Sequence, residues 1–381
     1  MRLTSKAISL LRLKNQQVGS SVLRSAEEVV AWMGAMQAQD YGMARWAVGV
    51  RQPGLSMADV QDAIDKGEII RTHVLRPTWH LVSPRDVSWM LDLTAPFIKA
   101  SMQRRLRELE LTSTFIRKGY DLIARELTAA PFLTREEIAA KFSDKKLDVQ
   151  GQRIAHLLLL AELDKLICSG PLKGKKNTYA LFSKRIKGSL ALSHEEALAA
   201  LCARYFQSHG PATLRDFAWW SGLPAREART ALDMSVKALQ SETVNDTDYW
   251  FADGTPGIRP RTSLYLLPAF DEFIISYNDR TASLEAAHHM SAIASNGLFR
   301  PVVVYNGQVI GLWKKTSAQK GPVIDVEFLP KVKVPKSDAF KKLLKTATRK
   351  VTEFYSISGS GAPSARFARA SSQYRSLNTD H

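Results

Sequence analysis

Two glutamines two positions apart are the residues of this sequence best suited to hold a small polar molecule. They stand in the segment Met36-Gln37-Ala38-Gln39-Asp40, where a helical pattern of apolar residues fades. Side chains at i and i+2 lie on the same side of an extended chain but point apart on a helix. A glutamine does not change protonation near neutral pH, yet its carbonyl oxygen can accept from a water. Gln37 and Gln39 are therefore expected to converge with Asp40 beside them, and an ordinary solvated helix end is the alternative.

A second group of polar and aromatic side chains surrounds a Pro-containing turn. His73 and His80 are seven positions apart, Trp79 precedes His80, and Arg76 stands at the turn. No third ligand follows at a spacing typical of metal sites, so two structural histidines are favoured over a metal site. Trp79 is expected in the core, with pocket lining as the alternative. Arg76 is a candidate phosphate contact.

Basic residues distinguish one expected hairpin from another. The hairpin near residues 165–182 holds Lys173, Lys175 and Lys176, whereas the one near residues 242–251 holds Asp246 and Asp248. Only the first of these two loops is suited to phosphate.

A second basic segment runs from residue 331 to residue 350. It contains eight Lys or Arg against one acid, Asp338, and includes Lys341, Lys342 and Lys345. A solvated helix face is the alternative to DNA contact here, but the density of one sign of charge is unusual.

The elements that must position these residues follow a repeated layout. Three times a helical stretch runs into two β-like segments joined by a short turn, which is the layout of a winged helix with its hairpin wing. The paired segments are 69–75 with 78–82, 165–168 with 178–182, and 242–244 with 249–251.

Helix start signals support this layout. Thr134 with Glu137, and Thr213 with Asp216, are spaced as capping boxes before a helix, a turn and another helix. In the first repeat, helices are expected over 5–15, 25–36 and 56–66, with Ser25 and Glu28 as a further box and a helix end at Gly67.

From about residue 258 the pattern changes to strands. Asn306-Gly307 between apolar runs is a strong two-residue hairpin signal, and a basic helix closes this region near residues 337–355. We expect an α+β protein with winged-helix domains at 1–110, 111–190 and 191–257, a C-terminal β-domain at 258–358, and a disordered tail at 359–381.

Length and composition set the broad class. The 381 residues carry 53 Lys+Arg against 37 Asp+Glu, a net charge of +16, and 45% are hydrophobic. This excludes a disordered chain and favours a polyanionic partner, nucleic acid above all. No apolar run approaches the ~18 residues of a membrane helix.

Cysteine is scarce. With only Cys168 and Cys202, neither a disulfide framework nor a Cys-built zinc site is expected, and the protein is expected in the cytoplasm.

The ordered motifs resemble those of one protein family. Gln37-Ala38-Gln39 resembles the Gln-apolar-Gln motif of the AlkZ-type winged-helix DNA glycosylases. With Gln39 the chain is similar to the Gln-x-Gln branch, since a sister branch has Asp there. Further similar segments follow in the family's order and cover most of residues 1–360: 71–80, 210–223, 266–280 and 300–313.

The resemblance implies a fold and an activity. The fold is a set of tandem winged helices that form a C-shaped, positively charged channel closed by the β-domain. The activity is hydrolysis of the N-glycosidic bond of alkylated purines, above all N7-alkylguanine, extending in some members to interstrand crosslinks. Gln37 and Gln39 would position the water, and Asp40, His80 and Trp79 would support them. No cofactor is implied.

The expected partner is double-stranded DNA that contains alkylated purines, bound by a monomer at the nucleoid without any membrane. A DNA-binding protein without catalysis, acting as a regulator or a structure-specific repair factor, is the alternative. The sequence shows no long heptad repeat for the dimer that a palindromic-site reader usually needs.

Overall fold

The computed structural model describes residues 3–19, 21–253, 262–318 and 321–356 as a mixed helix-and-sheet fold. Three stretches share one order of elements: a helix, a short strand or bridge, two helices and a two-stranded hairpin. We refer to them as unit 1 (residues 26–82), unit 2 (residues 113–181) and unit 3 (residues 194–252). The expected tail at 359–381 lies outside the described residues.

Unit 1 is preceded by α1 (Ser5–Asn15) and followed by the long helix α5 (Val87–Glu108). Its three strands form a sheet in the order β1-β3-β2, so the first strand pairs with the far arm of the hairpin. Its elements are α2 (Ala26–Met33), β1 (Ala35–Gln37), α3 (Tyr41–Arg51), α4 (Met57–Lys66), β2 (Ile70–His73) and β3 (Trp79–Val82).

Unit 2 repeats the strand order of unit 1, as β4-β6-β5. It comprises α6 (Ser113–Ala129), β4 (Leu133–Thr134), α7 (Arg135–Asp144), α8 (Arg153–Leu163), β5 (Ile167–Ser169) and β6 (Thr178–Leu181), with α9 (Phe182–Arg185) after it.

In unit 3 a single bridge between Ala212 and Trp250 takes the place of the first strand. Its elements are α10 (His194–His209), α11 (Leu214–Ser221), α12 (Ala225–Ser235), the 3-10 turn η1 (Val236–Ala238), β7 (Leu239–Val244) and β8 (Thr247–Ala252).

The C-terminal region is a four-stranded antiparallel sheet in the order β12-β11-β10-β9, covered by a long helix. Its elements are β9 (Leu264–Leu267), α13 (Glu272–Ile275), η2 (Ala286–His288), α14 (His289–Ala292), β10 (Val302–Tyr305), β11 (Gln308–Ala318), β12 (Gly321–Phe328) and α15 (Asp338–Ser356).

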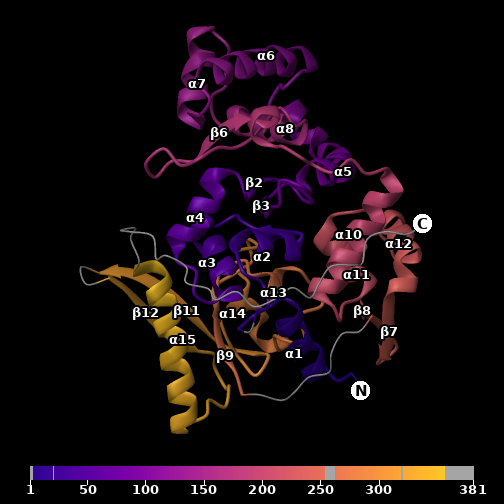
Figure 1. The fold of residues 1–381 in the computed structure, drawn as a ribbon, viewed down its shortest axis with the longest axis vertical. Helices are drawn as coiled ribbons and strands as arrows, with labels where there is room; N and C mark the ends of the chain where they lie inside the picture. The colour runs from indigo at the N-terminus through magenta and orange to yellow at the C-terminus, as the bar shows by residue number, and fades with distance from the viewer. Residues whose placement is uncertain (1–2, 20, 254–261, 319–320, 357–381) are drawn as a thin grey trace, which may run out of the picture.

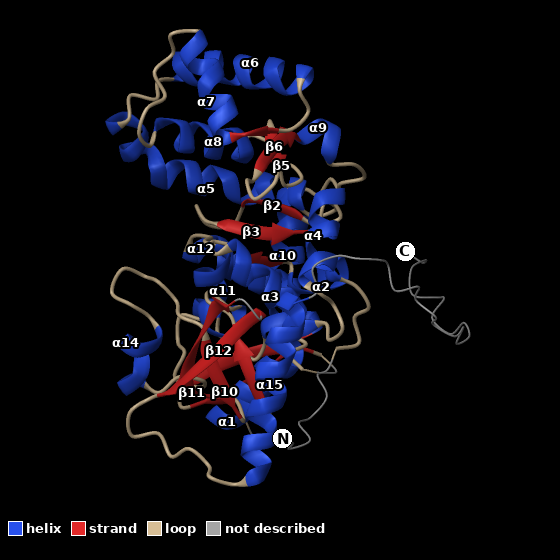
Figure 2. Ribbon diagram, turned by 90° about the vertical axis from the view of Figure 1, so that its left-hand side faces the viewer, coloured by secondary structure: helices blue, strands red, loops and turns tan. Residues whose placement is uncertain are grey.

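Unit 1 occupies the middle of the molecule. Unit 2 stacks on one side of it, the C-terminal sheet lies on the other, and unit 3 lies beside it (Figures 1 and 2). One buried core cluster joins unit 1 to the sheet and α15. A second joins residues of unit 1 and unit 2 to α5 and unit 3, and a third lies mostly within unit 2. Unit 1 is therefore held from several sides.

Several local sequence predictions are confirmed. Thr134 and Thr213 make reciprocal capping boxes, Gly67 ends α4 in the left-handed region, and Asn306-Gly307 joins β10 to β11 with positive φ at both residues.

The predicted helix over 25–36 is wrong at its end, because it stops at Met33. Gly34, at φ +78°, turns the chain into β1. The predicted box at Ser25 is also incomplete. Ser25 accepts from the Glu28 N–H, but the Glu28 carboxylate accepts from the Arg24 N–H instead.

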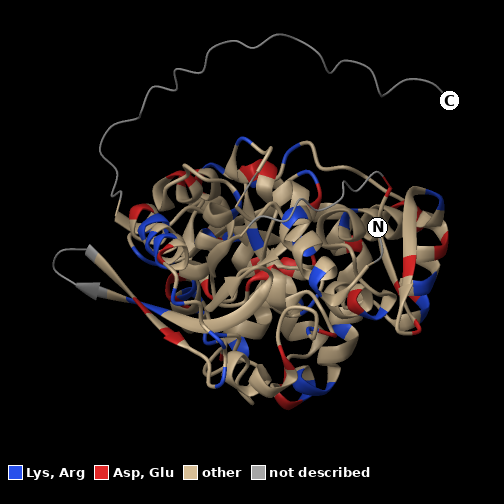
Figure 3. Cartoon of the chain, turned by 90° about the horizontal axis from the view of Figure 1, so that it is seen from below, with Lys and Arg blue, Asp and Glu red and all other residues tan. Residues whose placement is uncertain are grey.

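Basic and acidic residues are interspersed over the elements in the view of Figure 3. Within the described part of the chain, no helix is both long and apolar enough to cross a membrane.

Candidate functional site

The two glutamines lie at the end of an edge strand of the unit 1 sheet. Gln37 is the last residue of β1 and pairs in register with His80 of β3. The pairing continues one residue further, because the Ala38 N–H donates to the Trp79 carbonyl at 2.7 Å. Gln37 therefore belongs to a strand and not to a helix end.

The two glutamine side chains differ in environment. Gln37 is buried, and its Oε1 accepts from the Ala38 N–H at 3.1 Å. Gln39 is exposed, and its Oε1 lies 3.4 Å from the Trp79 N–H. One amide is held inside the protein and the other is open to a ligand.

Asp40 has a defined structural task. Its Oδ1 accepts from the Met43 N–H at 3.0 Å, so it caps the N-terminus of α3, where a negative charge is favourable. The residue is exposed. Capping α3 is therefore the role that the contacts of Asp40 indicate.

A buried carboxylate from the C-terminal region anchors Gln37. Glu272 accepts from the Gln37 N–H at 2.5 Å through Oε1, and its Oε2 accepts from the Ser276 hydroxyl and lies 3.5 Å from His209 Nε2. Burial alone would raise the pKa of Glu272, but these hydrogen bonds and the His209 ring outweigh burial and lower the pKa to about 2. Glu272 is therefore an anion fixed against the backbone of the motif.

His80 and Arg76 bring unpaired polar atoms to the same place. Burial and the neighbouring Arg76 lower the pKa of His80 to about 3, so its ring is neutral at pH 7. Its Nδ1–H donates to the Thr78 carbonyl at 2.9 Å, which leaves Nε2 as an acceptor. His80 Nε2, Arg76 Nε and Thr78 Oγ1 are buried without a hydrogen-bond partner among the described residues.

Arg76 does not extend freely from the turn into solvent. Its guanidinium lies 5.9 Å from the ring centre of Trp219, a partly exposed residue of unit 3, and burial lowers its pKa. The side chain is therefore directed toward unit 3, on the side where Glu272 lies.

Arg71 of β2 clamps the carbonyl between the two glutamines. Its Nε and Nη2 donate to the Ala38 carbonyl at 3.2 and 3.0 Å. The guanidinium also lies 4.1 Å from the Trp79 ring centre and 5.2 Å from that of Tyr41. Glu272 and Arg71 thus hold the motif's backbone through an N–H and a carbonyl respectively.

Trp79 is half-buried and forms part of a wall between units 1 and 2. His73 packs against its ring at 4.1 Å, and His73 Nδ1 in turn pairs with the buried Glu162 of unit 2. His73 therefore has a structural partner. Among the described residues, no three His, Cys, Asp or Glu side chains come together as metal ligands.

Comparison with known proteins identifies a family and a relative for this chain. The family described as DNA glycosylase AlkZ-like matches residues 30–351. The chain belongs to this family.

One protein similar in sequence is the Interstrand DNA cross-link repair glycosylase of Streptomyces sahachiroi. It is 24% identical over 362 residues, which cover 89% of this chain and 96% of that protein. The solved structure of Streptomyces sahachiroi DNA glycosylase AlkZ superposes with a TM-score of 0.79 at 21% identity, over 94% of this chain and 98% of that one. The second likeness shows that the fold is shared.

The predicted lysines lie in two places. Lys173, Lys175 and Lys176 are in the loop between β5 and β6, beside unit 1, and Lys173 pairs with Glu137.

Lys341, Lys342 and Lys345 are exposed near the start of α15. The other end of that helix reaches the motif's neighbourhood, where the Tyr355 hydroxyl donates to the Gly42 carbonyl at 3.1 Å. At 1.5 Å per residue, Lys342 lies about 20 Å along the helix from Tyr355.

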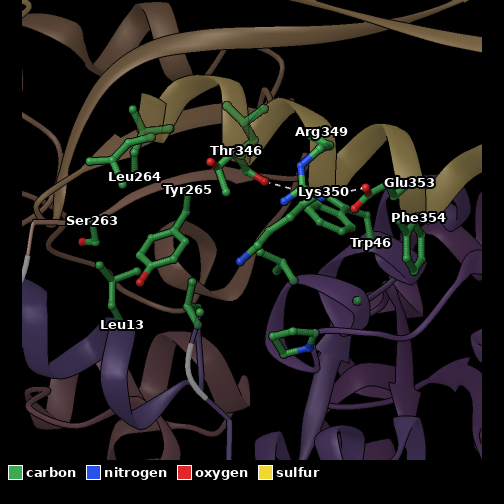
Figure 4. A pocket seen from close by; sticks show the side chains of 18 of the residues that line it. Leu13, Trp46, Ser263, Leu264, Tyr265, Thr346, Arg349, Lys350, Glu353 and Phe354 are labelled. Carbon is green, nitrogen blue, oxygen red and sulfur yellow. Dashed lines mark hydrogen bonds and ion pairs between the residues drawn. The ribbon is translucent and has the colours of Figure 1, made fainter. Parts of the chain in front are cut away.

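A cavity of about 1030 Å³ opens away from the glutamines, between α1, α3, β9 and α15. Figure 4 shows its lining, which includes Leu13, Trp46, Tyr265, Lys350 and Phe354. None of the predicted site residues lines it.

Sequence reasoning did not identify Glu272 or Arg71 as parts of the site. Both lie in segments that resemble the family, but each contact joins residues far apart in the chain, Glu272 to Gln37 and Arg71 to Ala38. The nearest signal in the sequence is the acidic pair Asp271-Glu272, which begins four residues after the apolar strand Leu264–Leu267 ends.

Proposed function

We propose that this member of the AlkZ-like family is a monofunctional DNA glycosylase that hydrolyses the N-glycosidic bond of cationic alkylated purines, chiefly N7-alkylguanine. The arrangement of Gln37 and Gln39, one held and one open beside a buried anion, is the observation that carries the proposal. Interstrand crosslinks at N7 of guanine are proposed as further substrates, in keeping with the name of the Streptomyces sahachiroi relative.

The chemistry asks little of a general acid or base. Alkylation at N7 gives guanine a positive charge, so the base already departs readily and does not need to be protonated. The sugar becomes cationic as the bond to the base breaks, and the enzyme must place a water and stabilise that charge. We therefore expect poor activity on neutral lesions.

The residues can divide these tasks. The Gln39 carbonyl and the unpaired His80 Nε2 are acceptors, and Gln37 fixes the edge from which Gln39 extends. An acceptor aligned on a water raises electron density at its oxygen without taking a full proton. The ionised Glu272 supplies negative potential in a site of low dielectric, where charge acts over longer range than in water. In this proposal Glu272 and not Asp40 supplies the negative charge, because the Asp40 carboxylate caps α3.

We further propose that the three units are winged helices, bounded at 1–110, 111–190 and 191–257 and followed by a β-domain at 258–358. Together they would form a basic, C-shaped channel around duplex DNA. The protein would act as a monomer on chromosomal DNA in the cytoplasm, with no cofactor.

The test is base release from a duplex that contains a single N7-methylguanine. We expect wild type to leave an abasic site, and Gln37→Ala/Gln39→Ala to release base about 100-fold more slowly or worse, since the water loses its orientation. Gln103→Ala, an exposed glutamine of α5, is the matched control and should equal wild type. Duplex affinity is measured in parallel.

Each other outcome has a definite meaning. Tight duplex binding without release by wild type would favour a non-catalytic DNA-binding protein. Equal release by wild type and the double variant would keep the enzyme but remove the glutamines from catalysis.

A further inference from the structure

A small cavity lies near the glutamines, and two of its lining residues, Arg71 and Trp79, contact the motif directly. Its volume is about 340 Å³, at the small end for ligand sites. Its walls come from β2 and β3 of unit 1 and from the start of α7 and the β5–β6 hairpin of unit 2. The two units are joined there by the Arg71 N–H, which donates to Ser169 Oγ at 2.9 Å.

The lining is strongly cationic. Arg71, Arg135, Lys175 and Lys176 face the cavity, and Glu136 is the single acid among its lining residues. That carboxylate is already shared, since it lies 3.5 Å from the Arg135 guanidinium and 3.6 Å from Lys176 Nζ. The remaining positive charge has no counter-ion in the wall.

Two of the cations make no ion pair with the described residues. Arg71 is 7% exposed, and burial lowers its pKa although the buried Glu162, which forms no ion pair with it, raises that pKa in part. Its five donors are not all used by its bonds to the Ala38 carbonyl. Lys175 is exposed, and its side chain makes no hydrogen bond or ion pair with the described residues. One cation is buried and bonded to the Ala38 carbonyl, and the other is exposed.

The sign of this charge decides what the cavity can hold. An N7-alkylguanine carries a positive charge and would be repelled, so the cavity is unsuited to the damaged base. An anion gains from both cations, and a phosphate can accept from the planar guanidinium and the ammonium together. Trp79 and Tyr179 add aromatic walls, with ring centres 6.5 Å apart, against which a sugar can lie.

We propose that this cavity binds one phosphodiester of the damaged strand, next to the lesion, and so sets the position of the sugar over Gln39. The link to the motif is short: Arg71 holds the Ala38 carbonyl, and the Trp79 N–H faces the Gln39 amide. A phosphate seated on Arg71 places the neighbouring sugar beside the exposed glutamine. This inference rests on the proposed glycosylase function and names the part of the DNA that this side of the site holds.

The experiment measures binding without turnover. The probe is a duplex with one 2′-fluoro-N7-methylguanine, in which the fluorine disfavours the cationic sugar and so prevents base loss during the measurement. We expect Lys175→Ala to lower the slope of log affinity against log salt by about 0.9, the value for one lost phosphate contact. Lys118→Ala, which removes the same charge from exposed α6 of the same unit, leaves the slope near that of wild type.

A scan of neutral phosphates locates the contact. Single methylphosphonates are placed at successive positions around the lesion. We expect one position adjacent to the lesion to weaken wild type several-fold and to have no further effect on Lys175→Ala, because the same contact is already lost. Equal losses for both proteins at every position, or an unchanged salt slope, would overturn the proposal.

Failure of the phosphate cavity and failure of the glycosylase proposal have different signatures. Base release from N7-methylguanine with an unchanged salt slope in Lys175→Ala removes the cavity and keeps the enzyme. The converse, a lost phosphate contact without any base release by wild type, keeps the cavity as a DNA-binding site of a non-catalytic protein.

Discussion

The side chains around the motif differ in how fully their polar atoms are satisfied. Arg51 and Asp271, which hold α3 to the C-terminal region, are both buried and meet in two hydrogen bonds of 2.8 and 2.9 Å. Arg51 Nε and one ring nitrogen of His80 are nevertheless buried without a hydrogen-bond partner among the described residues. A buried polar atom without a partner costs free energy, and a ligand that it serves is one reason for such an atom to persist.

His80 should make the protein less stable in acid. Its pKa is about 3 in the folded chain against 6.5 without the fold, because burial and Arg76 disfavour the charged ring. Between these values a proton binds only the unfolded chain, so stability falls as pH drops from 6.5 toward 3. We expect His80→Gln to flatten the dependence of unfolding free energy on pH by up to about 1.4 kcal/mol per pH unit.

Urea unfolding at several pH values between 4 and 6.5 checks this expectation. His289→Gln, in an exposed residue of α14, is the matched control and should keep the wild-type slope. The same slope in His80→Gln and in wild type would show that the ring titrates alike in the folded and unfolded chains.

At the scale of elements, the turn from α2 into β1 determines where the glutamines lie. Gly34 has φ +78°, and a Cβ at this position would come within 3.0 Å of Arg204 Cγ. We expect Gly34→Ala to destabilise the protein by about 1–3 kcal/mol through backbone strain. Because β1 follows directly, base release should also fall, as measured on N7-methylguanine duplex alongside urea unfolding.

Gly54→Ala is the control that separates the effect of backbone strain from the effect of moving β1. Gly54 has φ +102°, but a Cβ there meets nothing within 4 Å, and the residue lies in the exposed loop between α3 and α4. It should lose stability with unaltered base release per folded molecule. Equal loss of release in both variants would mean that the α2–β1 turn does not control the site.

The elements that the sequence predicts well are those fixed by local chemistry. Capping at Thr134 and Thr213 needs only residues three apart, and Asn306-Gly307 needs only tolerance of positive φ. The end of α2 was missed because apolar residues continue to Met36, and the pattern does not reveal whether Gly34 continues the helix or ends it. The paired position of Gln37 and His80 depends on β1 meeting β3, which is tertiary.

The site as a whole was predicted only in part for the same reason. Residue type and spacing single out Gln37 and Gln39 as candidates, and the resemblance gives them their proposed role, whereas Glu272, which accepts from the Gln37 N–H, lies 235 residues away. Nothing local to Glu272 indicates which backbone N–H it accepts from. The charge of the cavity at Arg71 likewise arises only when units 1 and 2 meet.

At the scale of the whole molecule, the boundaries of the buried core clusters do not follow the boundaries of the three units and the C-terminal region. Unit 1 and the C-terminal sheet share one core, in which Phe354 of α15 packs against Trp46 of α3 at 5.1 Å. Most buried residues of unit 2 form a separate cluster within residues 122–179, while Leu160, Leu163 and Cys168 belong to the cluster of α5 and unit 3. A shared core should open as one body, and a self-contained core can open alone.

Hydrogen exchange with two core variants tests this division. Phe142→Ala and Phe354→Ala each remove a buried ring, 0% and 3% exposed, and should cost about 3–5 kcal/mol where the cavity forms. We expect Phe142→Ala to reduce amide protection in α6, α7 and α8 and to leave β1 and β9 protected. Phe354→Ala should reduce protection in α3, β1 and β9 together, because its ring belongs to the core that those elements share.

The glutamines lie in that shared body, so Phe354→Ala should also slow base release, whereas Phe142→Ala should act mainly through the cavity at Lys175. Uniform loss of protection in both variants would mean that the molecule opens as a single unit.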